Sequence, residues 1–293
     1  MKKFVTNIFG FAIATLVLMY LLDFGYTSIY RNSFPRTKTQ YLKTLKGQKI
    51  DYVFIGSSRV LSGIVPSVIE ERTNKKALNL GFQAARMHDI YTILKLVDYY
   101  NIKTEKIFIQ VDYAYNFNAT SPIYQTEVLP FIHDNAVFND HIKFDPSTYY
   151  KYYYVPFYRY SKNDLKLGFR EVFLNVMNKK TNALNNDGYS PLEGTSATHK
   201  YGLPEKINLN NVYVDSIQIF CKKKNIPFAF YCAPFCGHVI DNHFVDKLKK
   251  KIPGLYDFSK AINDEQMFND PLHMNDSGAK SFTNIFIDKV LKN

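Results

Sequence analysis

The chain of 293 residues contains no tryptophan and only three cysteines, Cys221, Cys232 and Cys236. An odd and small number of cysteines is not typical of a fold held together by a disulfide framework. Cys232 and Cys236 can pair if the chain turns back after Cys232, and a buried free thiol is the alternative for each. The cysteine content therefore leaves the redox compartment of the protein open.

Acidic residues are also few, since 26 Asp and Glu stand against 37 Lys and Arg and give a formal net charge of +11. This charge favours acidic partners such as phospholipid headgroups, anionic glycans or nucleic acid. The sequence has no zinc-finger spacing and no RNA-binding aromatic motif, so we expect no nucleic-acid partner. Its histidines show no convincing metal-ligand spacing, and we predict no metal ion and no other cofactor.

Hydrophobic residues make up 46% of the chain and charged residues 22%, which is typical of a folded globular protein and not of a disordered one. The 24 phenylalanines and 23 tyrosines are an unusual feature. Aromatic side chains in such numbers suit a surface that faces carbohydrate or lipid, but they also fill hydrophobic cores. The core is the more common place for them.

The N-terminus carries an uncharged, largely apolar run, Phe4 to Leu22, directly after Lys2 and Lys3. About 20 helical residues cross the hydrocarbon core of a bilayer. A cleaved signal peptide has a shorter apolar region and a cleavage site of small residues. Here Asp23-Phe24-Gly25-Tyr26 follows, without an Ala-x-Ala pattern. We therefore predict an uncleaved single-pass transmembrane helix, with residues 1–26 as a membrane anchor.

Short apolar runs alternate with amphipathic segments in much of the remaining chain, which predicts an α/β domain over residues 49–293 after a connector at 27–48. The expected strands are residues 50–55, 77–80, 106–111, 227–232 and 255–258. The expected helices are one from Pro66, one over 89–101, one of about fifteen residues after Asn208, and two over 244–252 and 277–291. Such alternation predicts a parallel sheet with helices on both faces.

Residues 113–204 interrupt this alternation. They include a tyrosine-rich tract from Tyr149 to Tyr160 and a turn-rich segment from Asn185 to Thr195. A stretch of this length without a regular pattern is uncommon inside a compact domain. We predict an insertion after the third strand that covers the active face and contains some helices.

Two motifs carry residues suited to nucleophilic catalysis. Gly56-Ser57-Ser58 directly follows the first predicted strand, at the end of the sheet where parallel α/β proteins bind ligands. Asp270 and His273 lie in a predicted loop before the last helix, where the carboxylate can orient the imidazole as a general base. Each motif has a plain alternative, because Gly-Ser-Ser is a common turn and Asn275 or Asp276 caps the last helix.

Together with Asn79-Leu80-Gly81, these motifs resemble those of the SGNH or GDSL hydrolase superfamily. The resemblance covers residues 50–112 and about 208–293. It implies a three-layer α/β/α, flavodoxin-like fold.

The same resemblance assigns roles to individual residues. Ser58 matches the nucleophile, His273 the general base and Asp270 the residue that orients it. The backbone N–H groups of Ser58 and Gly81 would belong to the oxyanion hole.

The sequence departs from the family pattern at two places. Ser57 replaces the Asp of the first motif, and Gln110-Val111-Asp112-Tyr113 stands where the family has Gly-x-Asn-Asp, whose Asn completes the oxyanion hole. Gln83 and Asn116 are the candidates to replace that Asn. The candidate substrate-binding residues are Arg59, Gln83, Arg86 and Asn116. Either arginine can bind an anionic group of a substrate, or it is a surface or structural arginine.

The predicted function is a serine-dependent esterase or O-acyltransferase that acts on acyl groups of a cell-envelope polysaccharide. The chain resembles membrane-tethered SGNH proteins of glycan acetylation and of teichoic-acid D-alanylation. This implies an acylated glycan as substrate, a membrane acyltransferase as partner, and a catalytic domain on the extracytoplasmic side of the cytoplasmic membrane. The alternative is a catalytically inactive SGNH-fold protein that binds glycan or acts as a scaffold, as the missing Asn indicates.

Overall fold

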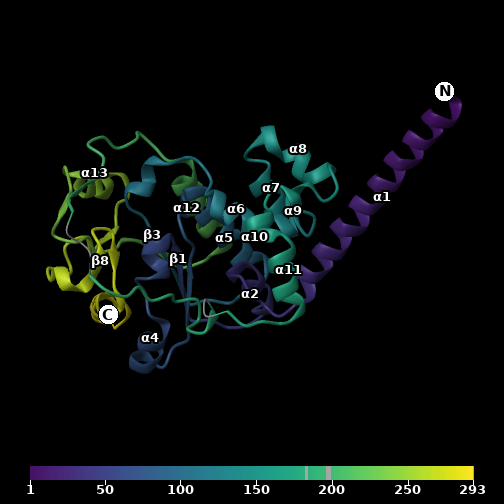
Figure 1. Ribbon diagram of the computed structural model, residues 1–293. Helices are drawn as coiled ribbons and strands as arrows, with labels where there is room; N and C mark the ends of the chain where they lie inside the picture. Colours follow the sequence, from purple (N-terminus) through teal and green to yellow (C-terminus); the bar gives the residue numbers. More distant parts are fainter. Residues whose placement is uncertain (182–183, 196–198, 293) are drawn as a thin grey trace. The chain divides into compact units, whose positions relative to one another are not determined.

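The computed structural model describes residues 1–181, 184–195 and 199–292 (Figure 1). The chain divides into two compact units, each made of two segments. Unit 1 is Met1–Gln40 with Gln125–Lys180, and unit 2 is Tyr41–Tyr124 with Thr181–Asn293. The two units are described separately below.

Unit 1 begins with the long helix α1, Lys2–Asn32, which contains 31 residues. By length and composition it is able to cross a membrane, and its apolar window is not buried against other described residues. The sequence therefore predicted this helix correctly. The helix does not stop after the apolar run but continues as one element to Asn32. After Leu22 it includes polar side chains among the apolar ones.

The segment between β3 and α12 is mainly helical. Its elements are η1 Tyr113–Asn116, α6 Pro122–Val128, η2 Leu129–Phe131, α7 Ala136–Ile142, α8 Pro146–Tyr154, α9 Tyr158–Ser161, α10 Asp164–Leu167 and α11 Phe169–Val176. Side chains begin some of these helices, since Asn135 caps α7 and Asp145 caps α8. None of these helices exceeds nine residues, which is why the sequence shows no sustained period here.

Unit 2 is built on a five-stranded parallel sheet, as the sequence predicted. The strands are β1 Tyr52–Gly56, β2 Ala77–Gly81, β3 Lys106–Gln110, β5 Phe228–Cys232 and β7 Tyr256–Asp257. Their order is β2-β1-β3-β5-β7, and every neighbouring pair is parallel. The apolar runs predict these strands to within two residues because most positions in them are buried.

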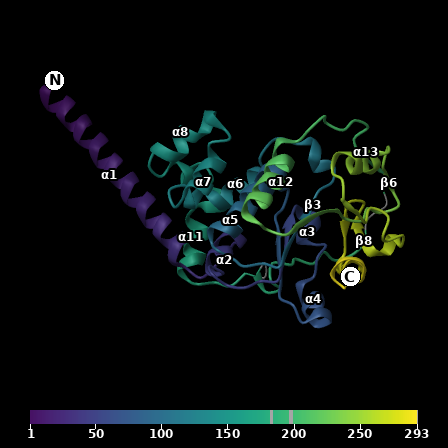
Figure 2. The same cartoon turned by 180° about the vertical axis from the view of Figure 1, so that it is seen from behind.

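Helices cover both faces of this sheet. They are α4 Pro66–Thr73, α5 Met87–Tyr99, α12 Val212–Lys224, α13 Phe244–Lys251 and α14 Asp276–Phe286. A short π-helix, η5 Ile287–Leu291, follows α14. On one face, α4 packs against α14 (Figure 2). Both helices share a core with Phe54 and Phe108. Val53 and Ile55 alternate with Phe54 and so point to the other face, where α5 contacts β1 and packs against α12.

Shorter elements complete the described chain. They are α2 Lys38–Thr44, α3 Ser58–Leu61, β4 Tyr201–Gly202, β6 Val239–Ile240, η4 Glu265–Met267, β8 Phe268–Asp270 and β9 His273–Met274. β4 pairs with β6 in parallel, and β8 pairs with β9 in an antiparallel hairpin. The sequence did not predict these pairs, because strands of two or three residues leave no periodic pattern.

Phe286 lies at the centre of the core beneath the sheet. Its ring centroid is 5.4 Å from that of Phe54, 5.0 Å from Phe108 and 5.2 Å from Tyr231. We expect Phe286→Ala to lower the free energy of unfolding by about 3–5 kcal/mol, because it opens a cavity among aromatic rings. Urea unfolding checks this value. Leu209→Ala is the control, since Leu209 is 83% exposed in the same unit, and a similar loss in both variants would contradict the assigned core.

Candidate active site

Ser58 is the first residue of α3, where the chain turns sharply after β1. A Cβ atom on Gly56 would collide with Val60 and would lie 2.8 Å from Cβ of Gln110, so only glycine fits at this position. Ser57 caps α3, and its Oγ accepts a hydrogen bond from the N–H of Arg59 at 3.3 Å. The turn thus presents Ser58 beyond the carboxyl end of a central strand.

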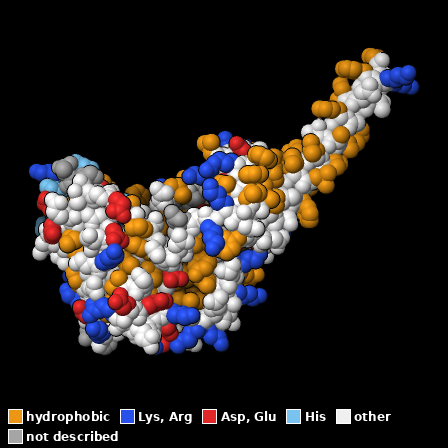
Figure 3. All heavy atoms as spheres, turned by 60° about the horizontal axis from the view of Figure 1, so that its bottom comes forward, with side chains coloured by type: hydrophobic (Ala, Val, Ile, Leu, Met, Phe, Trp, Pro, Cys, Tyr) orange, Lys and Arg blue, Asp and Glu red, His pale blue; other side chains and the backbone are white. Residues whose placement is uncertain are grey.

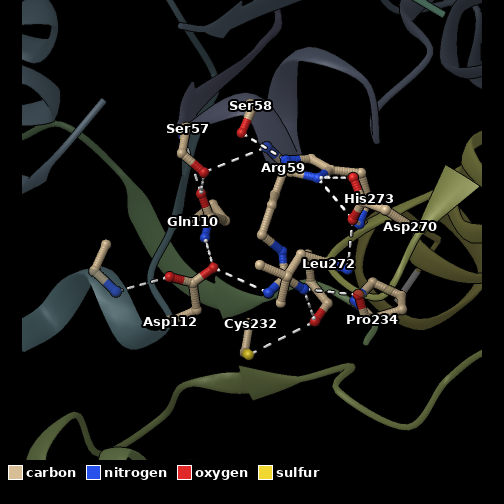
Figure 4. Close-up of polar contacts among 12 residues, drawn as sticks. Ser57, Ser58, Arg59, Gln110, Asp112, Cys232, Pro234, Asp270, Leu272 and His273 are labelled. Atoms are coloured by element: carbon tan, nitrogen blue, oxygen red, sulfur yellow. Dashed lines mark hydrogen bonds and ion pairs between the residues drawn. The ribbon is translucent and has the colours of Figure 1, made fainter. Parts of the chain in front are cut away.

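The side chains of Ser58, His273 and Asp270 form a continuous chain of hydrogen bonds (Figure 4). Oγ of Ser58 lies 2.8 Å from Nε2 of His273. Nδ1 of His273 lies 2.9 Å from Oδ2 and 3.0 Å from Oδ1 of Asp270. All three side chains are partly exposed, so a solute can reach them.

Asp270 and His273 lie on the β8–β9 hairpin and not in the loop that the sequence predicted. The two residues are opposite each other in the hairpin register. Oδ1 of Asp270 also accepts the backbone N–H groups of Leu272 at 2.8 Å and of His273 at 2.9 Å. The two backbone N–H groups therefore hold the carboxylate in place beside the imidazole.

The environment of Asp270 favours its charged form. Partial burial opposes ionisation, but the hydrogen bond and charge of His273 and the two backbone N–H groups outweigh it and lower the pKa of the carboxyl below its ordinary value. A carboxylate at this place retains the proton on Nδ1 of His273. Nε2 is then an acceptor for the hydroxyl of Ser58, which is the arrangement of a general base beside a nucleophile.

A buried polar network lies beneath Ser58 and was not predicted from the sequence. Oε1 of Gln110 accepts hydrogen bonds from the N–H of Ser57 at 3.0 Å and from its Oγ at 2.9 Å. Nε2 of Gln110 donates to Oδ2 of Asp112 at 2.6 Å. The same carboxylate oxygen lies 3.1 Å from a guanidinium nitrogen of Arg59, which closes the network (Figure 4). The sequence feature that could have indicated this network is the pair of polar residues Gln110 and Asp112 at the end of a buried strand.

Arg59 has the internal contacts of a structural arginine, the alternative that the sequence left open for it. Its side chain is 1% exposed and pairs with Asp112. Its NH2 group donates to the carbonyl oxygens of Ala233 at 2.8 Å and Pro234 at 2.7 Å, and the guanidinium carbon stacks 3.7 Å from the ring centroid of Phe235. These contacts leave the side chain no exposed surface with which to meet a substrate.

Both polar groups of the Asn116 side chain form internal hydrogen bonds. Its Nδ2 donates to the carbonyl of Lys206 at 2.8 Å, and its Oδ1 accepts the N–H of Asn208 at 2.9 Å. Its carbonyl accepts from Nδ2 of Asn208 at 3.0 Å. Asn116 therefore fastens η1 to the segment before α12.

Gln83 and Arg86 lie in the turn between β2 and α5. Gln83 is exposed, and its carbonyl accepts a hydrogen bond from Oγ of Ser121 at 3.5 Å. Arg86 precedes α5; its N–H donates to Oδ2 of Asp89 at 2.8 Å, and its guanidinium lies 5.7 Å from the ring centroid of Phe117. Within the described ranges, neither side chain forms a hydrogen bond or an ion pair with Ser58 or His273. Their predicted roles stay predictions.

Gly81 ends β2 against α3, where a Cβ atom would collide with the N–H of Leu61 and lie 2.8 Å from the carbonyl of Ser57. Its own N–H donates to Oδ1 of Asn79 at 2.9 Å. The N–H of Ser58, at the start of a helix, has no helical carbonyl as acceptor. Of the two predicted oxyanion donors, the N–H of Gly81 is therefore already bound by the side chain of Asn79.

A cavity of about 260 Å³ lies beside the hairpin, lined by apolar residues such as Phe235, Cys236 and Ile262 and by polar ones such as Asp241 and Lys260. The N–H of Cys236 donates to the carbonyl of Pro271 at 3.1 Å, which joins the cavity wall to the turn between β8 and β9. All three cysteines are buried and free, so Cys232 and Cys236 do not form a disulfide here. Burial raises the pKa of the Cys221 and Cys232 thiols, which makes these two unreactive.

No family model and no curated protein matches this chain. Among solved structures, one described as a provisionally assigned platelet activating factor from Streptococcus pneumonia is a distant neighbour. The match covers 94% of this chain and 98% of that chain, with 12% sequence identity and a TM-score of 0.39. A likeness at this level does not define the activity or substrate of the present chain.

The Arg59–Asp112 pair provides a test of the network beneath Ser58. We expect Asp112→Asn to lower the free energy of unfolding by about 3 kcal/mol, because it leaves a buried guanidinium without its counter-charge. Urea unfolding measures the loss. Asp288→Asn is the matched control, since Asp288 forms an exposed pair with Arg72 and should leave the midpoint nearly unchanged. Equal effects in the two variants would contradict a special role for the buried pair.

Proposed function

We propose that this chain is a membrane-anchored serine hydrolase or acyltransferase of the SGNH type. Ser58 is its nucleophile, His273 its general base and Asp270 the residue that orients and stabilises the imidazole. The observation that carries the proposal is the unbroken hydrogen-bonded chain from Oγ of Ser58 through His273 to Asp270. Three residues from two distant parts of the sequence meet in the geometry that acyl transfer requires.

The sheet supports the proposed fold family. Its order, β2-β1-β3-β5-β7, corresponds to the flavodoxin-like order 2-1-3-4-5. In such sheets ligands bind beyond the carboxyl ends of the central strands, and Ser58 follows β1 at that end. We propose a three-layer α/β/α SGNH fold over residues 49–293 with an insertion at about 113–204, preceded by an anchor at 1–26 and a connector at 27–48.

The proposed reaction begins when Oγ of Ser58 attacks the carbonyl carbon of an acyl ester. The hydroxyl proton moves to Nε2 of His273, and the carbonyl oxygen becomes an oxyanion. The tetrahedral intermediate then expels the alcohol, which takes the proton from Nε2. An acyl group remains bound to Oγ of Ser58.

A second hydroxyl group completes the cycle by the same steps in reverse. His273 removes a proton from this hydroxyl as its oxygen attacks the acyl-enzyme, and the proton returns to Oγ of Ser58. Water as the attacking group gives hydrolysis, and a sugar hydroxyl gives transfer. Both outcomes use the same three side chains.

The proposed site has few donors with which to stabilise the oxyanion. The N–H groups of Ser58 and Gly81 are the proposed donors, and Gly81 must exchange Oδ1 of Asn79 for the substrate oxygen. The absence of one donor typically costs about 3 kcal/mol of transition-state stabilisation. The proposed enzyme therefore depends more on its nucleophile, its base and substrate positioning than an enzyme with a complete oxyanion hole does.

We propose acyl groups of a cell-envelope polysaccharide as the substrate and a membrane acyltransferase as a partner. An apolar N-terminal helix that is able to cross a membrane supports a site close to the envelope. The net charge of +11 supports an anionic glycan. The proposed location is the extracytoplasmic side of the cytoplasmic membrane.

The alternative function is a glycan-binding or scaffold protein that retains the fold without catalysis. The engagement of the Gly81 N–H by Asn79, and of the Asn116 amide by Lys206 and Asn208, favours it. This protein would bind polysaccharide but would not react with a serine-directed probe.

Replacement of Ser58 separates these two functions. We expect the intact chain to react covalently with a fluorophosphonate probe and Ser58→Ala to abolish the labelling, because only an activated hydroxyl attacks phosphorus at neutral pH. Acetyl-ester release should fall by about 10⁴-fold or more in the same variant. Ser67→Ala, an exposed serine of α4, should behave as the unsubstituted chain. Absent labelling together with polysaccharide binding would support the alternative.

Replacement of Asp270 tests the assigned base. We expect Asp270→Asn to lower kcat by roughly 10³–10⁴-fold, because an amide does not hold Nδ1–H of His273 toward itself as a carboxylate does. Ester release at several pH values measures this. Asp264→Asn, an exposed carboxylate nearby in sequence, is the control. Unchanged kcat in Asp270→Asn would remove this residue from the mechanism.

The lowered pKa of Asp270 also predicts a pH dependence of stability. The folded carboxyl has the lower pKa, so its stabilising contribution is complete above the unfolded pKa of about 4 and is lost as pH falls through the folded pKa. Urea unfolding between neutral and acid pH should therefore show a smaller acid loss in Asp270→Asn than in the unsubstituted chain. An equal loss in both proteins would contradict the ionised state assigned to Asp270.

A further inference from the structure

Unit 1 leaves several large apolar side chains exposed on its short helices. We name as the apolar rim four of these side chains: Tyr150, Tyr154, Val155 and Leu165. Their exposed fractions range from 39% for Val155 to 94% for Leu165. They lie on or directly after α8 and α10, and α9 contacts both of these helices. Exposed apolar side chains gathered in this way mark a surface that contacts a membrane or another protein.

Polar contacts hold α9, which lies between α8 and α10 in the chain, against α1. The N–H of Phe157, just before α9, donates to Oδ2 of Asp23 at 2.7 Å. The guanidinium of the buried Arg159 donates to Oδ1 of Asp23 at 2.7 Å and to Oγ1 of Thr27 at 2.8 Å. These contacts lie in the turn of α1 that directly follows the apolar run ending at Leu22. The end of α8 therefore lies close to the end of the apolar run.

The dimensions of a bilayer connect this placement to lipid. With a helical rise of 1.5 Å per residue, residues 23–27 lie within about 8 Å of Leu22 along α1. The interfacial region on each side of the hydrocarbon core is about 5–8 Å thick. If Phe4 to Leu22 fills the core, the contacts of Asp23 and Thr27 with α9 lie at the level of the headgroups. In both ribbon views α8 lies on the side of unit 1 from which α1 projects (Figures 1 and 2).

The chemistry of the rim suits this level of a bilayer. Tyrosine has an apolar ring and a polar hydroxyl, and it is enriched at the boundary between lipid and water. Basic residues accompany the rim: Lys151 on α8 and Lys166 on α10 are exposed, and so is Lys162, directly after α9. The space-filling view shows hydrophobic side chains around the base of α1 with Lys and Arg side chains beside them (Figure 3). Long basic side chains extend from an apolar surface toward lipid phosphates.

We propose that the apolar rim of unit 1 lies in the interfacial region of the bilayer that α1 spans, with the neighbouring basic side chains on anionic headgroups. The inference rests on the membrane anchor of the proposed function. Lipid and not a partner protein is assigned as the occupant, because the rim adjoins the helix whose apolar residues face lipid and because basic residues accompany it.

Site-directed spin labelling of the full chain in vesicles tests the proposal. The chain is reconstituted in phosphatidylcholine with phosphatidylglycerol, and a nitroxide is attached separately to Tyr150→Cys, Val155→Cys and Leu165→Cys. The native cysteines are at most 2% exposed, and the unsubstituted chain controls for their labelling. Collision with oxygen reports lipid, and collision with a water-soluble nickel chelate reports water.

Two further positions calibrate the measurement. Leu18→Cys lies in the apolar run and reports whether α1 is in lipid. Lys180→Cys is the aqueous control in the same unit, because it is exposed and follows Lys179, whose carbonyl accepts a hydrogen bond from Arg36 beyond the end of α1. Far-ultraviolet circular dichroism confirms that each labelled variant is folded.

The expected result is an oxygen-to-nickel collision ratio at all three rim positions several-fold above that of Lys180→Cys. Rim ratios equal to that of Lys180→Cys, while Leu18→Cys is in lipid, would overturn the inference and leave the anchor intact. An aqueous Leu18→Cys would instead overturn the anchor and the inference together. Labelling of Ser58 by a fluorophosphonate is a separate readout, so a failure of the catalytic proposal is distinguishable from either.

Discussion

The ion pair between Arg59 and Asp112 is the interaction on which the geometry around Ser58 depends. A guanidinium that is 1% exposed needs an internal counter-charge, because water does not reach it. Asp112 provides the charge, the carbonyls of Ala233 and Pro234 provide acceptors, and Phe235 covers the plane. The ends of β3 and β5 and the start of α3 are thereby joined at one buried group.

Gln110 extends this connection to the turn that carries the nucleophile. It accepts both the N–H and the hydroxyl of Ser57 and donates to Asp112, so Ser57 has little freedom to move. Ser58 is the next residue, and its position relative to His273 follows from this arrangement. The hairpin that carries His273 is held by the backbone N–H groups that Asp270 accepts.

The sequence predicted the parts of the fold that have a strong local pattern. The five strands are apolar runs buried in the sheet, and α14 begins where Asn275 accepts the N–H of Gly278. The sequence also placed Ser58 after β1, and Asp270 and His273 before α14, but it did not predict the hairpin that brings His273 to Ser58. The roles of these residues remain proposals.

Other features had no readable pattern. The hairpin β8–β9 is too short for one, and the helices of residues 113–204 contain at most nine residues each. The internal contacts of Arg59 were not predicted, because its partners follow β3 and β5 and are distant from it in the sequence. The contacts of Asn116 were not predicted for the same reason, since its partners lie at Lys206 and Asn208.

The continuity of α1 has a mechanical consequence. The helix passes from its apolar run to Asn32 without a break, and Asp23 and Thr27 hold it to Arg159 within unit 1. A transmembrane helix adjusts to the thickness of its bilayer by tilting. If α1 spans a bilayer as proposed, a change of its tilt would also turn the part of unit 1 that Asp23 and Thr27 hold to it. Membrane thickness would then set the angle at which unit 1 meets the lipid surface.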